Sequence, residues 1–330
     1  MKKNKRIVIF GFGSIGRKYV RLIKKYFSDI EIFIISSGKI NIYEESNLIN
    51  GYYLDHSKIK QINPDGVIIA SPATQHLNDA FYCIDLKVPI LIEKPISNNL
   101  KDVSNFKKKI LEKKSKILIG YVLRYSINSN LFKQNISNHN LGNLLFARVN
   151  CSSYLPSWRP YQDYRRTVSA SSKYGGGVLL ELSHEIDYAN WFFGPFLEVQ
   201  AVLKNSGTLD IDVEDTADLI LTNSKGMNVT IHLDFCSRFP IRECKLHGSK
   251  GTMNLDFLDK SLEIVNPKLE TLFSNKEDDS ENMFVNQLTY FLKGVFHEDF
   301  IINNVDDGIE TLKIIESARL SNQLNKVIEL

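Results

Sequence analysis

The stretch Arg6–Gly16 reads RIVIFGFGSIG, and it decides the fold of the first part of the chain. Its first five residues are an apolar, β-branched run, which is typical of a buried strand in a parallel sheet. The next six spell G-x-G-x-x-G: they are Gly11, Phe12, Gly13, Ser14, Ile15 and Gly16. In such a turn the first glycine bends tightly, the second lets a pyrophosphate approach, and the third permits close packing of helix on strand. We therefore predict a dinucleotide-binding turn, with the phosphates at a helix N-terminus.

The segments that follow alternate between strand and helix. Residues Gly16–Phe27 carry apolar side chains at helical spacing, and Ile30–Ile35 is a second apolar run. Further strands are expected at Val67–Ala70, Ile90–Ile92 and Ile117–Ile119, and further helices at Gln75–Asp85 and Leu100–Lys113. This alternation predicts a doubly wound parallel sheet, a Rossmann domain that we place at residues 1–121.

After residue 121 the pattern changes to long alternating segments separated by hairpin turns. These are expected strands of a largely antiparallel open sheet. Two helices are expected beside it, at Leu179–Phe193 and Val305–Leu320. We place an α/β domain for substrate binding and oligomerisation at residues 122–330. Its expected strands are Leu144–Ser153, Leu197–Lys204, Thr216–Leu221, Met227–Phe235, Arg242–His247 and Thr252–Phe257.

Composition narrows the class of protein. The chain has 330 residues, of which 43% are hydrophobic and 24% charged, and a net charge of +3. This is ordinary globular composition, and the small charge argues against a nucleic-acid or membrane partner. No apolar run approaches the roughly 18 residues of a membrane span, and no signal peptide is indicated. The four cysteines lack C-x-x-C spacing, so we expect free thiols, no metal site and a cytoplasmic protein.

The residues after the second strand bear on the choice of cofactor. An Asp or Glu commonly binds the ribose 2′-hydroxyl there, but this chain has Ser36, Ser37, Gly38 and Lys39. Two hydroxyls and a cation suit a 2′-phosphate, and Arg17 could add charge. The expected cofactor is therefore NADP or NAD, with Ser36, Ser37 and Lys39 as candidate contacts.

Four further motifs are distributed along the chain. They are Ala70–His76 (ASPATQH), Glu93–Pro95 (EKP), Gly120–Tyr125 (GYVLRY) and Gly175–Asp187 (GGGVLLELSHEID). Together with the glycine turn, this set resembles the glucose-fructose oxidoreductase, inositol dehydrogenase and rhizopine-catabolism family, written Gfo/Idh/MocA. The resemblance covers nearly the whole chain.

The resemblance implies a Rossmann domain followed by an α/β domain whose exposed sheet face often forms an oligomer interface. It implies hydride transfer at a carbon of a sugar, cyclitol or sugar nucleotide, with Lys94 and His184 as the catalytic groups. The cofactor side of the site would include Ser71, Pro72, His76 and Glu93. Among these we expect His76 to anchor a loop rather than to carry protons.

The chemistry of these residue types is compatible with those roles. A lysine at the carboxyl end of a strand points to the crevice where ligands bind in such a sheet. Histidine has an unperturbed pKa near 6.5 and is suited to general acid–base work. On a single helix, Glu181, His184, Asp187 and Tyr188 would share one face, and a carboxylate there could orient the imidazole. Many family members have an Asp four residues before the histidine, where this chain has Leu180, so the role of Glu181 stays open.

Other candidates for substrate contact are Tyr121 and Arg124, beside Asp187 and Glu181. The Pro-rich stretch Tyr154–Arg166 adds aromatic rings and three arginines, including Trp158, Arg159 and Tyr164. Guanidinium groups could hold a carboxylate or phosphate of an acidic or nucleotide-linked sugar. Alternatively, the loop packs on its own domain or on a neighbouring subunit.

Three functional hypotheses follow. The first is an NAD(P)-dependent oxidoreductase of a sugar or sugar nucleotide, as in bacterial surface-glycan biosynthesis, acting as a homodimer or homotetramer. The second is a dinucleotide-binding regulator without catalysis, against which the presence of both Lys94 and His184 argues. The third is an oxidoreductase of a cyclitol or of a non-sugar such as a linear tetrapyrrole.

Overall fold

The structure is a computed structural model that describes residues 4–37, 44–137, 141–276, 281–297, 300 and 304–330. The chain divides into two compact units. The first comprises Met1–Gly120 and Val285–Ile309, and the second Tyr121–Phe284 and Glu310–Leu330. The return of Val285–Ile309 to the first unit is a feature that the single expected boundary at residue 121 did not include.

The first unit contains a six-stranded parallel sheet in the order β3-β2-β1-β4-β5-β6. This is the strand order of doubly wound dinucleotide-binding domains, with the switch point between β1 and β4. The sheet confirms the predicted Rossmann fold. Its strands are β1 (Arg6–Phe10), β2 (Glu31–Ile35), β3 (Gly51–Tyr53), β4 (Gly66–Ile69), β5 (Ile90–Ile92) and β6 (Ile117–Ile119).

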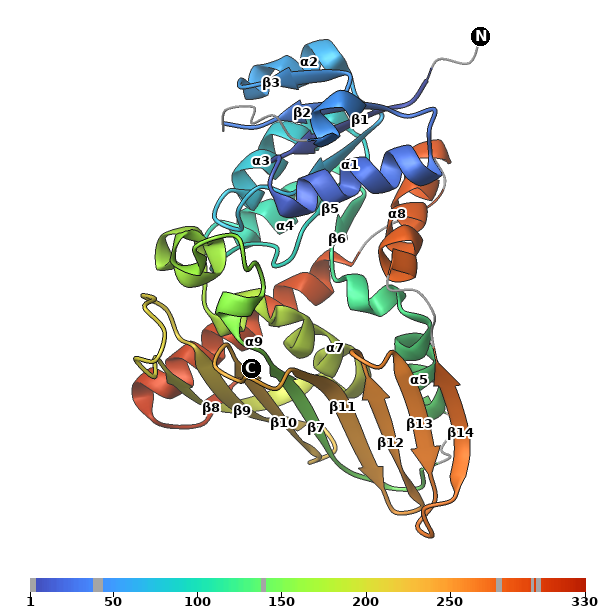
Figure 1. Cartoon of the computed structure of the whole chain (residues 1–330), viewed down its shortest axis with the longest axis vertical. Helices are drawn as coiled ribbons and strands as arrows, with labels where there is room; N and C mark the ends of the chain where they lie inside the picture. The colour runs from blue at the N-terminus through green and yellow to red at the C-terminus, as the bar shows by residue number, and fades with distance from the viewer. Residues whose placement is uncertain (1–3, 38–43, 138–140, 277–280, 298–299, 301–303) are drawn as a thin grey trace. The chain divides into compact units, whose positions relative to one another are not determined.

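Helices connect these strands as the alternation predicted (Figure 1). The apolar side chains of β1, β4 and β5 are fully buried, which fits strands covered on both faces. The helices are α1 (Ser14–Tyr26), α2 (Ile59–Ile62), α3 (His76–Cys83) and α4 (Val103–Lys113), joined by α8 (Glu281–Phe296).

The returning segment closes the free edge of this sheet. The Asn304 side chain accepts a hydrogen bond from the backbone N–H of Ile119 at 2.6 Å and donates one to its carbonyl at 3.2 Å. An amide side chain thus satisfies the edge strand β6 as a neighbouring strand would. Gly308 packs against the same residue, since a Cβ there would lie 2.9 Å from the Ile119 side chain.

The second unit contains a nine-stranded sheet in the order β14-β13-β12-β11-β7-β10-β9-β8-β15. Strands β7 and β10 pair in parallel and the other neighbours are antiparallel, which confirms the largely antiparallel sheet. The strands are β7 (Leu144–Ser152), β8 (Phe196–Lys204), β9 (Thr216–Asn223), β10 (Asn228–Asp234), β11 (Ile241–Gly248), β12 (Gly251–Asp256), β13 (Ser261–Val265), β14 (Thr271–Lys276) and β15 (Ile328–Glu329).

Helices cover one face of this sheet (Figure 1). Side chains alternate along the middle of the central strands, so that Val149 and Ile231 are buried beneath the helices while Arg148 and Thr230 are exposed on the opposite face. That open face carries polar and apolar side chains together. The covering helices are α5 (Ile127–Ser137), α6 (Val178–Glu181), α7 (Ser183–Phe193) and α9 (Val305–Leu324).

One predicted helix is wrong in a way that affects the site. Leu179–Phe193 was expected to be continuous, but the chain leaves the helical conformation at Leu182, with φ −99° and ψ 28°. Glu181 therefore belongs to the short helix α6, whereas His184 and Asp187 belong to α7. The four residues expected on one helix face do not share one helix.

Within the described residues, no helix is both long enough and apolar enough to cross a membrane. All four cysteines are free thiols, and Cys83, Cys151 and Cys244 are buried.

Candidate active site

The glycine turn lies at the switch point of the first sheet. Gly11 has φ +86°, and a Cβ at this position would lie 2.6 Å from the carbonyl oxygen of Ala70. The turn after β1 and the loop after β4 therefore approach each other more closely than any side chain allows. Gly16 is equally constrained, because its Cβ would collide with the backbone of Gly11.

Gly13 is different, since among the described residues no atom would lie within 4 Å of a Cβ there. Packing within the chain does not explain this glycine, whereas an approaching pyrophosphate would. Gly13 precedes α1 without a side-chain cap, and the first turn of α1 has no acidic residue. The N–H groups and positive dipole end of α1 thus suit the phosphates of a dinucleotide.

The other residues of the turn differ in their exposure to solvent. Phe12 is buried, with its ring 6.1 Å from that of Tyr52, while Ser14 is exposed and Ile15 half-buried. At the end of β2, the Ser36 N–H donates to Tyr53 and Ser37 is exposed. Lys39 lies outside the described residues.

Arg17, considered as an extra charge for a 2′-phosphate, faces an acid. Its guanidinium lies 4.0 Å from the Glu45 carboxylate, which also pairs with Arg21. Burial alone would raise the pKa of Glu45, but backbone hydrogen bonding and the two arginines lower it. The preference for NADP over NAD therefore gains no support from Arg17 and stays a prediction.

Lys94 is the second residue after β5 and is half-buried. Its backbone N–H donates to the carboxylate of Glu93 at 3.2 Å. Glu93 is buried and accepts a hydrogen bond from the Tyr19 hydroxyl of α1 at 2.5 Å. Burial raises the pKa of Glu93, against the opposing effects of Tyr19 and Lys94. The contacts of Glu93 support a role in holding this loop rather than in touching the cofactor.

The loop after β4 meets the Lys94 loop through a histidine. Ser71 is half-buried and Pro72 exposed, while the buried His76 begins α3. The two ring nitrogens of His76 lie within hydrogen-bond distance of the carbonyl oxygens of Ser71 and Pro95. These contacts agree with the expected anchoring role of His76.

His184 lies in the first turn of α7 and is half-buried. The ring of the buried Tyr121 packs edge-on against it, with 5.7 Å between ring centroids. Burial and the charge of Asp187 raise the pKa of the Tyr121 hydroxyl. The Glu181 carboxylate accepts a hydrogen bond from Ser169 at 2.9 Å.

Asp187 and Arg124 bind each other. The guanidinium donates from Nε and Nη2 to the two carboxylate oxygens at 2.8 and 2.7 Å. The side chains are only 10% and 2% exposed, and Trp191 lies beneath the guanidinium with its ring centroid 5.4 Å away. The sequence left Asp187 open between substrate contact and orientation, and this buried pair favours orientation.

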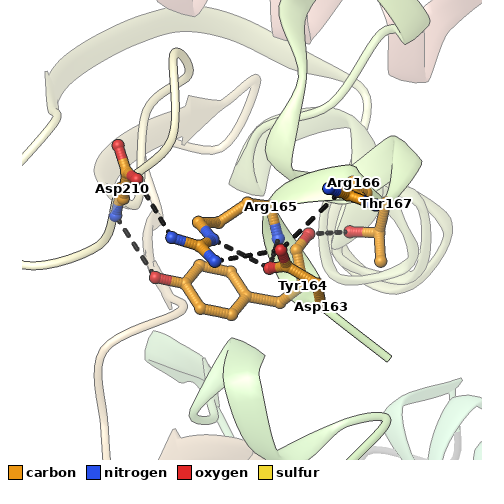
Figure 2. A network of polar contacts seen from close by, with 6 residues as sticks. All are labelled: Asp163, Tyr164, Arg165, Arg166, Thr167 and Asp210. Atoms are coloured by element: carbon orange, nitrogen blue, oxygen red, sulfur yellow. Dashed lines mark hydrogen bonds and ion pairs between the residues drawn. The ribbon is translucent and has the colours of Figure 1, made fainter. Parts of the chain in front are cut away.

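The three arginines of the loop Tyr154–Arg166 are not equivalent, and Figure 2 shows the polar network around Arg165. Arg165 pairs with Asp163 at 2.8 Å and with Asp210 at 3.5 Å. The Tyr164 hydroxyl accepts the N–H of Asp210, so this tyrosine is part of the same network. Arg159 is exposed, and Arg166 lies 3.8 Å from Asp163 but is 86% exposed.

Trp158 anchors the other end of this loop. Its Nε1–H donates to Ser153 at 2.9 Å, and its ring packs edge-on against the buried Phe235. The loop therefore packs partly on its own unit, as the alternative interpretation held. Arg159 and Arg166 are exposed cations of this loop.

Sequence reasoning did not identify the ion pair between Glu185 and Arg242. Glu185, next to His184, is fully buried and accepts from Arg242 of β11 at 2.8 Å. The signal was present, since an acid flanked by buried positions of a helix needs a partner, but the partner lies on a distant strand. Among the described residues, no cluster of His, Cys, Asp and Glu is arranged to hold a metal ion.

Two family models match this chain. One, described as an oxidoreductase family with an NAD-binding Rossmann fold, matches residues 5–121. The other, the GFO/IDH/MocA C-terminal domain, matches residues 130–254. The chain belongs to the Gfo/Idh/MocA oxidoreductase family. Its first unit holds the NAD-binding domain of that family, and the open glycine turn fits this cofactor.

Individual proteins of the Gfo/Idh/MocA family share only 15–25% sequence identity with this chain in the comparisons that follow. Myo-inositol 2-dehydrogenase of Thermotoga maritima is 25% identical over 67% of this chain and is matched over 66% of its own length. A levoglucosan dehydrogenase in complex with NADH and levoglucosan superposes with a TM-score of 0.86 at 15% identity, over 99% of both chains. The WlbA dehydrogenase of Chromobacterium violaceum in complex with NADH and UDP-GlcNAcA gives 0.78 at 17%, over 100% of this chain and 97% of that one. At these identities the two structures establish a shared fold.

Proposed function

We propose that this protein is a dehydrogenase or reductase that moves a hydride between NAD(H) and a hydroxyl-bearing carbon of a sugar or cyclitol. The observation that carries the proposal is Lys94, a lysine two residues beyond the end of β5 in a sheet whose glycine turn is open to a dinucleotide. Ligands of such sheets bind beyond the carboxyl ends of the strands. The family membership and the presence of His184 support the same activity.

In the oxidation direction, a carbon loses a hydride while its hydroxyl loses a proton. The bound nicotinamide supplies the hydride acceptor. We assign to Lys94 the stabilisation of charge that develops on the substrate oxygen. We assign to His184 the removal of the hydroxyl proton, for which a neutral imidazole is suited. The Tyr121 ring and the helix that Asp187 anchors would hold that imidazole in place.

We further propose that the substrate is an acidic or nucleotide-linked sugar. Arg159 and Arg166 are exposed cations on an aromatic loop, and guanidinium groups bind carboxylates and phosphates in bidentate fashion. An acidic or nucleotide-linked sugar, as in surface-glycan biosynthesis, would use them, whereas inositol or levoglucosan would not. The likeness in fold to a dehydrogenase crystallised with UDP-GlcNAcA makes this class worth testing first.

The test is NADH or NADPH absorbance with three probes: myo-inositol, levoglucosan and UDP-GlcNAcA. Wild type is compared with Lys94→Ala and His184→Ala. We expect turnover with one probe and a loss of about 10²–10⁴-fold in kcat in both variants. Variants that bind NADH and turn over like wild type would disprove the assignment. Tight NADH binding without turnover on a wide panel would favour a regulator instead.

We further propose that the protein is a homodimer or homotetramer that associates through the open face of the second sheet. That face exposes Phe146, Val202 and Ile220 among charged side chains. It also carries a recess of about 490 Å³ over β7, β9, β10 and β11. Sedimentation of wild type against Ile220→Glu tests this, and an unchanged mass would contradict the proposed face.

A further inference from the structure

His76 joins the two loops that follow neighbouring strands β4 and β5. It is buried at the first position of α3. Its Nδ1 lies 2.7 Å from the carbonyl oxygen of Pro95, the residue after Lys94. Its Nε2 lies 2.8 Å from the carbonyl oxygen of Ser71. One side chain therefore spans from the Lys94 loop to the Ser71 loop.

Both partners of the ring are acceptors. A backbone carbonyl cannot donate, so each contact needs an N–H on the ring, and a neutral imidazole has only one. The imidazolium form satisfies both carbonyls, and the neutral form satisfies one.

Burial and two ionisable neighbours act on this equilibrium. Asp79 lies three residues after His76 on α3, is buried, and favours the charged ring. The Asp79 carboxylate accepts a hydrogen bond from Ser71 Oγ at 2.6 Å and lies 2.9 Å from His56 Nε2. Lys94 opposes the charge. Burial has the largest effect and lowers the pKa of His76 below its usual value. The bond to Pro95 is thus formed in the imidazolium and in one of the two neutral tautomers.

We propose that His76 is a positioning residue for Lys94, and that it acts by donating from Nδ1 to the Pro95 carbonyl. The inference rests on the proposed catalytic role of Lys94. The Lys94 backbone is then held on both sides, by Glu93 through the Lys94 N–H and by His76 through Pro95. Misplacement of a reacting group by about 1 Å can cost 10²-fold in rate, so such a support is worth testing.

Three substitutions separate the two bonds of the ring. In His76→Asn the amide nitrogen takes the place of Nδ1 and can serve Pro95, whereas in His76→Gln it takes the place of Nε2 and can serve Ser71. His76→Phe keeps a ring and removes both donors. His56→Gln is the matched control, because His56 contacts the same Asp79 without a bond to the Lys94 loop.

The first readout is independent of substrate: amide hydrogen exchange of residues 93–98, measured with the unfolding midpoint of each variant. We expect exchange to accelerate at least tenfold in His76→Gln and His76→Phe, and to change less than threefold in His76→Asn and His56→Gln. The second readout is kinetic, with the best of the three probes. We expect kcat to fall at least tenfold in the Gln and Phe variants, with KM changed less than threefold.

Equal exchange rates in His76→Asn and His76→Gln would overturn the proposal. The wild-type protein gives a check that needs no variant, because one of its seven histidines must show a solvent-protected Nδ1–H in ¹⁵N-histidine NMR. Absence of such a signal would also overturn it. Absence of turnover in wild type would contradict the proposed function alone, since exchange and NMR still decide the role of His76.

Discussion

Two arginine–aspartate pairs of the second unit have similar geometry and different surroundings. Arg124 and Asp187 are 10% and 2% exposed, and they join the segment after β6 to helix α7. Arg165 is 53% exposed, and its partners Asp163 and Asp210 are 32% and 83% exposed (Figure 2). Both arginines lie in segments that the sequence offered for substrate contact. Burial makes the first pair a structural anchor, while solvent leaves the second free to rearrange around a ligand.

The two pairs should differ most in the stability that is lost when the aspartate of each pair is removed. Asp187→Ala leaves the Arg124 guanidinium buried without its counter-charge, so we expect the free energy of unfolding to fall by about 3–5 kcal/mol. Urea denaturation measures this loss. Asp163→Ala is the matched control: it removes an ion pair in contact with solvent and the side-chain cap of one short turn, so the free energy of unfolding should fall by only a small fraction of the loss in Asp187→Ala. Equal effects of the two substitutions would show that the first pair is not the anchor we describe.

The glycine turn offers a second comparison, between Gly11, which is closely packed, and Gly13, which faces open space. Gly13→Ala adds a methyl group where the described residues leave space, so the apo protein should keep its melting temperature. The methyl group takes the place of the pyrophosphate, and we expect the Kd for NADH to rise at least about tenfold, or ~1.4 kcal/mol. Fluorescence titration of NADH measures this.

Gly11→Ala serves as the comparison for that experiment. Its positive φ and the 2.6 Å approach to Ala70 predict a destabilised fold even without cofactor. If Gly13→Ala bound NADH like wild type, the turn would not be the phosphate site.

His232 lies on the open sheet face and is half-exposed, so its surroundings are intermediate between those of the two arginine–aspartate pairs. Its Nδ1 lies 2.6 Å from the Asp218 carboxylate and its Nε2 3.3 Å from the Asp234 carboxylate. Hydrogen bonding to Asp234, and then to Asp218, raises the pKa of His232 to about 9 against the effect of burial. A raised pKa stabilises the fold fully below the unfolded value near 6.5, and this stabilisation is lost as pH rises through about 9. After solvent screening we expect on the order of 1 kcal/mol.

The measurement is the melting temperature of wild type and His232→Gln from pH 6 to pH 10. The advantage of wild type should be greatest at pH 6 and should disappear near pH 10. A difference that does not depend on pH would mean that the His232 charge contributes nothing.

The smallest effect is expected at Arg165. Arg165→Gln removes an exposed cation whose partners are the half-buried Asp163 and the exposed Asp210, so the melting temperature should stay within error of wild type. Arg159→Gln should be equally silent in stability, but it should raise the Kd for UDP-GlcNAcA and leave the Kd for myo-inositol unchanged. If Arg165→Gln unfolded the protein, the network in Figure 2 would be structural after all.

The prediction of the fold succeeded where the determinants are local. The glycine turn, the parallel strands and the hairpins depend on short-range geometry and on side-chain alternation, which can be read along the chain. The helix break at Leu182 was missed, because apolar residues continue at helical spacing on both sides of it. Only the fold puts Glu214 at the start of α6, where its carbonyl accepts the N–H of Val178.

For the candidate site, the sequence offered motifs, whose roles stay predictions, and it gave no information on the contacts between them. Neither the partner of Asp187 nor that of Glu185 could be identified from spacing, since Arg124 lies 63 residues away and Arg242 lies 57 residues away. The role of Arg165 depended on Asp210, which belongs to another loop. Pairing over such separations is set by the packing of elements, and the sequence carries no local signal for it.

The sequence by itself indicated the family and the doubly wound parallel sheet, and it offered Lys94 and His184 as candidate catalytic residues, because local backbone chemistry and short motifs carry these signals. Only the tertiary structure decided which charges are available to a ligand. Asp187 is held by the buried Arg124, Arg165 pairs with two acids in contact with solvent, and Gly13 faces open space, since burial and partners depend on segments that are distant in the chain.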